Sequence, residues 1–178
     1  ALNKNPLMKF TRRFKQSIEY EKAVFKNSSS TEIFLLNNKQ AEDFKSVYQI
    51  SPNKITITPP GIDLNWSNHE QIGIHNAFKI PSEDKVALFV GSDFSRKGLD
   101  RAISSIYFLN ANNIPFSLLV IGKDNFGPYS ELVDKLGLND KIKYLGPRDD
   151  VASIMKSSDL LLHPAREEAA GNVIIESL

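Results

Sequence analysis

Downstream of Glu83, short apolar runs alternate with segments whose apolar residues recur at three- and four-residue spacing. The apolar runs predict four strands, at Val86–Val90, Ser117–Ile121, Lys141–Leu145 and Asp159–His163. A helical pattern follows each run, at Leu99–Leu109, Tyr129–Leu136 and Val151–Met155 and from Val173 onward. Strands that alternate with helices of this size indicate right-handed βαβ units, and therefore an α/β fold with a parallel sheet covered by helices on both faces.

Upstream of Glu83 the patterns are shorter and less regular. They predict a helix over Leu7–Phe25, a strand over Ile33–Leu36, a helix capped by Asn38 that runs through Tyr48, and a strand over Ile55–Thr58. Pro59–Pro60–Gly61 comes next, and it is the best candidate for a linker because proline removes N–H donors and glycine frees φ. Beyond it the periodicity is weak, and we expect one helix around Gln71–Phe78.

The amino-acid composition excludes only some classes of protein. The chain has 178 residues, of which 41% are hydrophobic, enough for one large or two small domains with a real core. The formal net charge of +1 gives no sign of a nucleic-acid-coating surface, and a chain without cysteine has no disulfide framework and no thiolate chemistry. There is no signal-peptide pattern and no apolar run long enough to span a bilayer, so we expect a soluble or peripheral protein. Neither end carries a start or stop signal, which suggests a fragment of a longer protein.

The predicted first helix is basic and amphipathic. Its basic residues, which outnumber Glu19 and Glu21, are Lys9, Arg12, Arg13, Lys15 and Lys22, with Lys4 and Lys26 just outside it. A helix of this kind can lie on an anionic membrane surface. A core-facing helix with a solvated basic face explains the same pattern equally well.

Loops that follow the strands of a parallel sheet gather at its carboxyl edge, where ligands bind. The first such loop runs from Gly91 and Ser92 to Gly98 and matches neither GxGxxG nor GxxxxGK[ST]. It carries Arg96, with a rigid guanidinium fork, and Lys97, with a mobile point charge, just before a predicted helix. These two cations indicate either a phosphate site or an ordinary exposed cationic loop.

The next two loops begin with glycine. Gly122 and Gly146 each follow a strand, where a residue without Cβ lets a flat ring approach the backbone, and Arg148 can stack on such a ring. Ordinary turn chemistry accounts for both loops as well, unless they converge on one ligand.

The fourth loop and the helix after it carry two carboxylates, Glu168 and Glu176. Between them, the backbone N–H groups of Gly171, Asn172 and Val173 are free to meet an anion at the helix start. Each carboxylate can accept two hydrogen bonds from a vicinal diol of a sugar. Complementing the helix dipole is the simpler alternative for acidic residues at this position.

Several segments resemble a known family. VGSDFSRKGLDRAI, LLVIGKD, YLGPRDDV and LLLHPAREEAAGNVIIESL are similar to the nucleotide-sugar-binding domain of retaining GT-B glycosyltransferases of the family-4 type, and within it to the branch that glucosylates the lipopolysaccharide core. FKNSSSTEIFLLNNKQAEDFKSVYQ and ITITPPGI are similar to the end of that family's first domain and to the interdomain crossing. The resemblance implies a Rossmann-like donor domain over residues 65–178, incomplete at its C-terminus, a linker over 59–64, and the end of an acceptor-side domain over 1–58.

The resemblance also implies roles for particular residues. It places Glu168, Arg96 and Lys97 in the catalytic set, with Glu168 near the donor sugar, Glu176 on the ribose and the two cations on the diphosphate. The implied donor-binding residues are Gly91, Ser92, Arg96, Lys97, Gly122, Arg148, Glu168, Ala170, Gly171, Asn172, Val173 and Glu176. Many family members carry Gly-Phe-Gly where this chain has Ala169–Ala170–Gly171, although the core-glucosyltransferase branch shares Ala-Ala-Gly. The family's glycine-rich acceptor loop is absent, so we expect this stretch to be inactive by itself.

The function implied is transfer of a hexose, most simply glucose from UDP-glucose, with retention onto a lipopolysaccharide core or other glycan. We expect no cofactor and no essential metal, because His69, His75 and His163 are scattered. The expected location is the cytoplasm, including the surface of the inner membrane. Three alternatives remain: a different donor such as GDP-mannose, a non-catalytic nucleotide-binding domain, and a dinucleotide oxidoreductase, which the missing glycine fingerprint disfavours.

Overall fold

The computed structural model describes residues 11–26, 28–63, 68–168 and 170–178. The chain divides after Pro60 into two compact units, each with its own core. Residues 7–10 of the predicted first helix lie outside the described ranges.

The described residues of the first unit form two helices and a pair of parallel strands. Its elements are α1 (Arg12–Phe25), β1 (Ile33–Leu35), α2 (Asn38–Tyr48), a 3-10 turn η2 (Pro52–Lys54) and β2 (Ile55–Ile57). Ile33 and Leu35, on one face of β1, are buried with Ala41 of α2 and with Ile50. The predicted cap is wrong by one residue: Asn37, in extended conformation, accepts a hydrogen bond from the Gln40 N–H, whereas Asn38 is already helical.

The second unit contains a four-stranded parallel sheet in the order β5–β4–β3–β6. Its elements in chain order are α3 (Ile74–Phe78), β3 (Lys85–Val90), α4 (Phe94–Lys97), α5 (Leu99–Ala111), β4 (Phe116–Ile121), α6 (Gly127–Lys135), β5 (Ile142–Gly146), α7 (Val151–Ser157), β6 (Leu160–Leu161) and α8 (Asn172–Glu176). The predicted α/β fold with a parallel sheet is confirmed.

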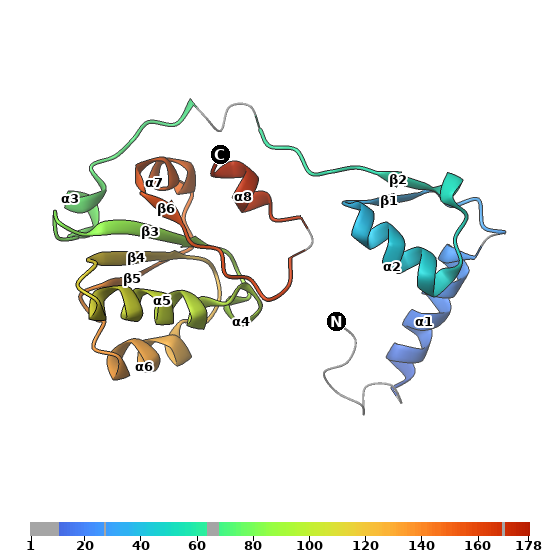
Figure 1. Ribbon diagram of the computed structural model, residues 1–178. Coiled ribbons are helices and arrows are strands. Elements are labelled where there is room, and N and C mark those ends of the chain that lie inside the picture. Colours follow the sequence, from blue (N-terminus) through green and yellow to red (C-terminus); the bar gives the residue numbers. More distant parts are fainter. Residues whose placement is uncertain (1–10, 27, 64–67, 169) are drawn as a thin grey trace. The chain divides into compact units, whose positions relative to one another are not determined.

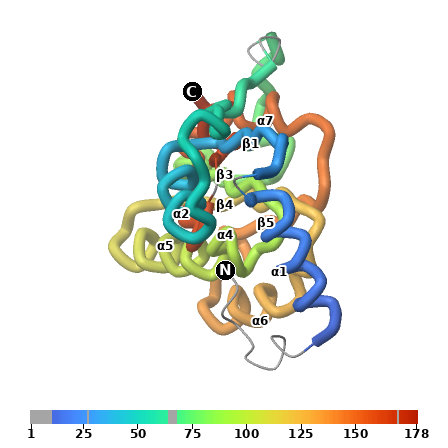
Figure 2. Tube along the Cα trace, turned by 90° about the vertical axis from the view of Figure 1, so that its right-hand side faces the viewer, coloured from blue at the N-terminus to red at the C-terminus, as the bar shows by residue number. Residues whose placement is uncertain are grey.

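Helices cover both faces of this sheet (Figures 1 and 2). Successive residues of a strand point to opposite faces, and Val86, Ala87, Leu88 and Phe89 are all fully buried. Ala87 and Phe89 pack in a core with α5 and α6, whereas Val86 and Leu88 pack in a second core with α3 and α7. This two-sided burial explains why the strands read as continuous apolar runs.

The strand order places a topological switch point between β3 and β6. From β3 the chain passes through α5 on one face to β4, but it reaches β6 through α7 on the other face. The loops that leave β3 and β6 therefore diverge, and such a divergence opens a crevice at the carboxyl edge of a parallel sheet. The loop after β3, which carries Arg96 and Lys97, and the loop after β6, which carries Glu168, are the ones that meet there.

Two local differences from the prediction affect this edge. Phe94–Lys97 forms the short helix α4, not an irregular loop, because Asp93 caps it and the Phe94 ring is fully buried beneath it. Arg96 and Lys97 therefore lie in the last turn of a helix. Strand β6 is only two residues long, so His163 lies beyond the end of the strand.

Candidate functional site

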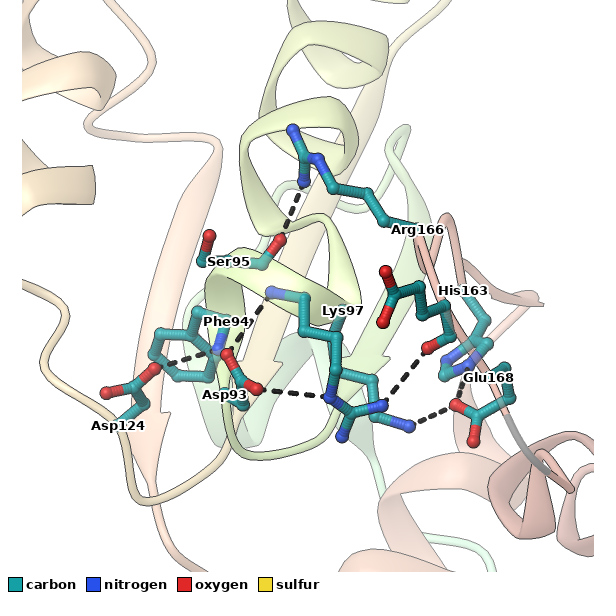
Figure 3. Close-up of polar contacts among 10 residues, drawn as sticks. Asp93, Phe94, Ser95, Lys97, Asp124, His163, Arg166 and Glu168 are labelled. Atoms are coloured by element: carbon teal, nitrogen blue, oxygen red, sulfur yellow. Dashed lines mark hydrogen bonds and ion pairs between the residues drawn. The ribbon is translucent and has the colours of Figure 1, made fainter. Parts of the chain in front are cut away.

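The α4 turn is fixed by its N-cap. Asp93 adopts a left-handed conformation (φ 59°), and its carboxylate accepts hydrogen bonds from the Arg96 backbone N–H at 3.2 Å and the Arg96 Nε at 3.1 Å. The Phe94 N–H donates to Asp124 Oδ2 at 2.8 Å, which ties α4 to the loop after β4 (Figure 3). Arg96 and Lys97 are thus presented on a braced turn.

The loop after β6 packs directly on this turn. The Arg166 N–H donates to the Arg96 carbonyl at 2.8 Å, and the Arg166 guanidinium donates to the Ser95 carbonyl at 2.7 Å (Figure 3). At Gly98 (φ 77°) a Cβ would overlap the carbonyl oxygen of Pro164, so only glycine permits this close approach. Two segments that lie far apart in sequence therefore form one surface.

Lys97 and Glu168 form an ion pair at the centre of that surface. The Glu168 carboxylate also accepts a hydrogen bond from His163 Nε2 at 3.1 Å (Figure 3). The side chains of Lys97, His163 and Glu168 are only 14%, 6% and 26% exposed. Burial opposes ionisation of Glu168, but the hydrogen bonds from Lys97 and His163, the Lys97 charge and the Gly171 N–H outweigh it, and the pKa of Glu168 falls from 4.5 to about 2.

Arg96 also contacts the fourth loop, and helix α8 follows that loop. Arg96 donates to the Glu167 carbonyl at 3.1 Å, so both cations of α4 face the loop. Gly171 is buried in a left-handed conformation (φ 66°) and is the N-cap of α8, which begins at Asn172. Glu176 lies in the last turn of α8, and within the described residues it forms no ion pair. Ala169 lies outside the described residues.

Gly122 has a structural reason to be glycine. A Cβ there would overlap the Gly91 carbonyl oxygen and crowd the Phe94 ring. The Gly122 N–H donates to the Gly146 carbonyl at 3.1 Å, and the Gly122 carbonyl accepts from the Tyr144 hydroxyl at 3.1 Å. Gly122 therefore brings the first three loops together, and its N–H is already used within the protein.

Arg148 contacts a carboxylate of its own loop and an aromatic ring. Its guanidinium forms two hydrogen bonds to Asp150, at 2.6 and 2.7 Å, and lies 5.7 Å from the centre of the Phe78 ring. The hydrogen bonds to Asp150 raise the pKa of Arg148. Ser92 contributes to a different feature, an open cavity of about 380 Å³ that it lines with Asp93, Lys123 and Asp124.

Four residues that organise the site were not identified from the sequence. Asp93 and Asp124 brace α4, His163 contacts Glu168, and Arg166 anchors the fourth loop. Asp93 had a readable signal, because it precedes a helical turn as a capping residue does. The others depend on partners distant in sequence, so no local pattern marks them.

Two negative findings apply to the described ranges only. No group of three or more His, Asp or Glu side chains there is arranged to hold a metal ion. No helix there combines the length and the apolar character that crossing a bilayer demands.

Comparison with known proteins identifies the family. Residues 70–178 match the family described as glycosyl transferases group 1. The lipopolysaccharide glucosyltransferase WaaG of Escherichia coli (strain K12) is 36% identical over 184 aligned residues, which cover 100% of this chain and 49% of WaaG. The D-inositol 3-phosphate glycosyltransferase of Stackebrandtia nassauensis is 27% identical, over 79% of this chain and 34% of that enzyme.

Solved structures agree at the level of the fold. The crystal structure of WaaG matches 98% of this chain and 49% of its own, with a TM-score of 0.86 and 35% identity. Anabaena HepE in complex with UDP and glucose matches 96% of this chain and 47% of its own, with a TM-score of 0.72 and 16% identity. The chain thus spans about half the length of WaaG, and its α/β architecture is that of GT-B glycosyltransferases.

Proposed function

The chain belongs to the group 1 glycosyltransferases, and from this premise we propose that the whole protein transfers a hexose, with retention, from a nucleotide donor to a glycan. Glucose from UDP-glucose is the proposed donor, since the WaaG relative is a glucosyltransferase, and a lipopolysaccharide core is the proposed acceptor. The observation that carries the proposal is the convergence of Arg96, Lys97 and Glu168 at the switch point of the sheet.

The proposed chemistry follows from the charges in this cluster. In glycosyl transfer, positive charge develops on the sugar ring while negative charge grows on the departing diphosphate. Arg96 and Lys97 are held on a braced turn, so the backbone of the turn can stay in place while Lys97 exchanges Glu168 for the leaving diphosphate, which both cations stabilise. Glu168 stays ionised throughout the neutral range, because its pKa is about 2. Its carboxylate can therefore interact with the positive charge that develops on the sugar ring.

The rest of the donor is assigned around this centre. Glu176 is proposed to accept hydrogen bonds from the two ribose hydroxyls, and its freedom from an ion pair within the described residues is consistent with that role. The backbone of Ala170, Gly171, Asn172 and Val173 is proposed to lie along the phosphates and the sugar. We propose that Arg148 and the loop that contains Gly122 contact the base of the donor, and that Gly91 and Ser92 lie beside its diphosphate.

The domain assignment is also a proposal. The unit up to Pro60 is taken as the end of the acceptor-side domain, and the unit from Gly61 as the donor domain. Catalysis then requires the remainder of the acceptor side, so these 178 residues alone should transfer no sugar. We also propose that the enzyme works in the cytoplasm and that α1, none of whose residues is buried, meets an anionic membrane surface there.

A ligand screen on the full-length protein tests the proposal. UDP and UDP-glucose should raise the melting temperature more than GDP and GDP-mannose do, and NAD should have no effect. A preference for the guanosine ligands would favour the GDP-mannose alternative instead. Binding of UDP without sugar transfer to any glycan acceptor, lipopolysaccharide core included, would favour a non-catalytic nucleotide-binding domain.

A further inference from the structure

The Arg166 side chain points away from the proposed donor site and binds a carboxylate in the first turn of α5. Arg166 Nη1 donates to Asp100 Oδ1 at 2.9 Å and Arg166 Nη2 donates to Asp100 Oδ2 at 2.5 Å, a bidentate pair between residues 66 positions apart. The same Nη1 donates to the Ser95 carbonyl at 2.7 Å (Figure 3). A planar guanidinium that meets three acceptors fixes direction as well as distance.

This contact lies only two residues before Glu168. Besides the hydrogen bonds of the loop backbone with Arg96, two side chains of the loop hold it near α4 and α5: Arg166 contacts Asp100 and the Ser95 carbonyl, and Glu168 contacts Lys97. The Glu168–Lys97 ion pair is the weaker contact during catalysis, because a diphosphate that binds Lys97 competes with Glu168 for the same ammonium group. The contacts of Arg166 with Asp100 and Ser95 involve none of the proposed donor-binding side chains, so they persist when the donor binds.

We propose that Arg166 and Asp100 are positioning residues that keep the Glu168 loop on α4 while Lys97 changes partner from Glu168 to the donor diphosphate. The inference rests on the proposed function, since it assigns the purpose of the contact to sugar transfer. A simple surface ion pair is the alternative, as the two side chains are 36% and 42% exposed. Exposed pairs contribute little to stability, so variants of this pair should fold.

The test uses the full-length protein with Arg166→Ala, Asp100→Ala and the double variant. Lys85→Ala is the matched control, because it removes a different ion pair, that with Asp159 at 2.9 Å, at the opposite edge of the sheet. Backbone hydrogen exchange is followed in the peptide that contains residue 166, whose N–H donates to the Arg96 carbonyl. UDP affinity, kcat and KM for the donor are measured on the same preparations.

Positioning predicts a characteristic set of results. Exchange of the loop peptide should speed up in both single variants, by about tenfold in Arg166→Ala, which also loses the hydrogen bond to the Ser95 carbonyl, and by less in Asp100→Ala. The double variant should exchange no faster than Arg166→Ala, because Asp100 acts on the loop through Arg166. The kcat should fall by about tenfold or more, since misplacement by about 1 Å can cost that much, while UDP affinity stays within about twofold. Arg166→Lys should give an intermediate kcat, because a lysine keeps the charge without the fork.

Other results decide against the inference. Loop exchange like that of the wild type, or additive losses in the double variant, would overturn the positioning itself. Faster exchange with an unchanged kcat would reduce the contact to a structural one. If the wild-type protein transfers no sugar at all, the proposed function fails and the role in transfer falls with it, while the exchange measurement still decides whether Arg166 holds the loop.

Discussion

Replacing Glu168 by Gln should tighten nucleotide binding while it slows sugar transfer. The substitution keeps the size of the side chain and removes its charge. In the free protein that charge is paired with Lys97, the cation proposed to receive the donor diphosphate. A bound diphosphate therefore meets both an attractive ammonium group and a repulsive carboxylate.

The size of the effect on binding follows from Coulomb's law. A carboxylate and a phosphate about 5 Å apart repel each other by about 0.8–1.7 kcal/mol at an effective dielectric constant of about 80 to 40. Removing the carboxylate should thus lower the Kd for UDP by about 4- to 16-fold, and the gain should shrink as salt is added. The kcat should fall instead, because the carboxylate proposed to serve the sugar is gone.

The same variant has a defined effect on stability against pH. The pKa of Glu168 is about 2 in the folded protein and 4.5 ordinarily, so its contribution to folding is fully present above pH 4.5 and is lost as the pH falls toward 2. That gap corresponds to at most about 3 kcal/mol, and we expect about 1–2 kcal/mol because solvent screens the exposed part of the side chain. The difference in unfolding free energy between wild type and Glu168→Gln should therefore be largest near pH 6 and should diminish toward pH 3.

Calorimetric titration of UDP and urea unfolding at several pH values measure both effects on the full-length protein. Glu131→Gln, which removes an exposed carboxylate of α6 outside the proposed donor site, is the control for general charge effects. Two results would refute the reasoning: a Kd for UDP that is unchanged or higher in folded Glu168→Gln, or a stability difference that does not depend on pH.

Three further predictions concern other parts of the chain. Gly122→Ala should lower the free energy of unfolding by about 3 kcal/mol or more, because the added Cβ would overlap the Gly91 carbonyl. The control Gly73→Ala should change it little, because no atom lies within 4 Å of the added Cβ. Equal urea midpoints for the two variants would contradict this prediction. Glu176→Ala should weaken UDP binding about thirtyfold, or about 2 kcal/mol, and a Kd within about twofold of wild type would exclude the ribose role. The full-length protein should bind anionic vesicles through α1 with about 1 kcal/mol per basic residue near the surface, weakening with salt, and equal sedimentation with neutral vesicles would leave α1 a purely structural helix.

The sequence predicts the parallel sheet well because its signals are local and strong. Four buried apolar runs, each followed by a helical pattern, leave few alternative folds. The errors lie where a single contact decides the backbone. A four-residue helix such as α4 has no periodicity to detect, and whether Asn37 or Asn38 caps α2 depends on which side chain meets the Gln40 N–H.

The candidate site was only partly predictable, for a related reason. The loops with Arg96, Lys97 and Glu168 follow from the rule that ligands bind at the carboxyl edge of a parallel sheet. The contacts of Arg166 with Asp100 and of His163 with Glu168 require the folded arrangement, because α4 and the loop after β6 meet only through the strand order. Gly122 shows a further limit: the sequence suggests an approach by a ligand there, whereas the approach of the protein's own backbone at Gly91 becomes visible only in the structure.

We propose that the last turn of α4 receives the diphosphate of a nucleotide donor. UDP is titrated into full-length wild type, Lys97→Met and Lys85→Met, because both variants remove a lysine that forms an ion pair, at opposite edges of one sheet. Lys97→Met should raise the Kd for UDP by about tenfold or more, because a charge-assisted hydrogen bond to the diphosphate is lost, whereas Lys85→Met should leave the Kd within about twofold. An equal Kd for UDP in folded Lys97→Met and wild type would show that the diphosphate does not bind at α4.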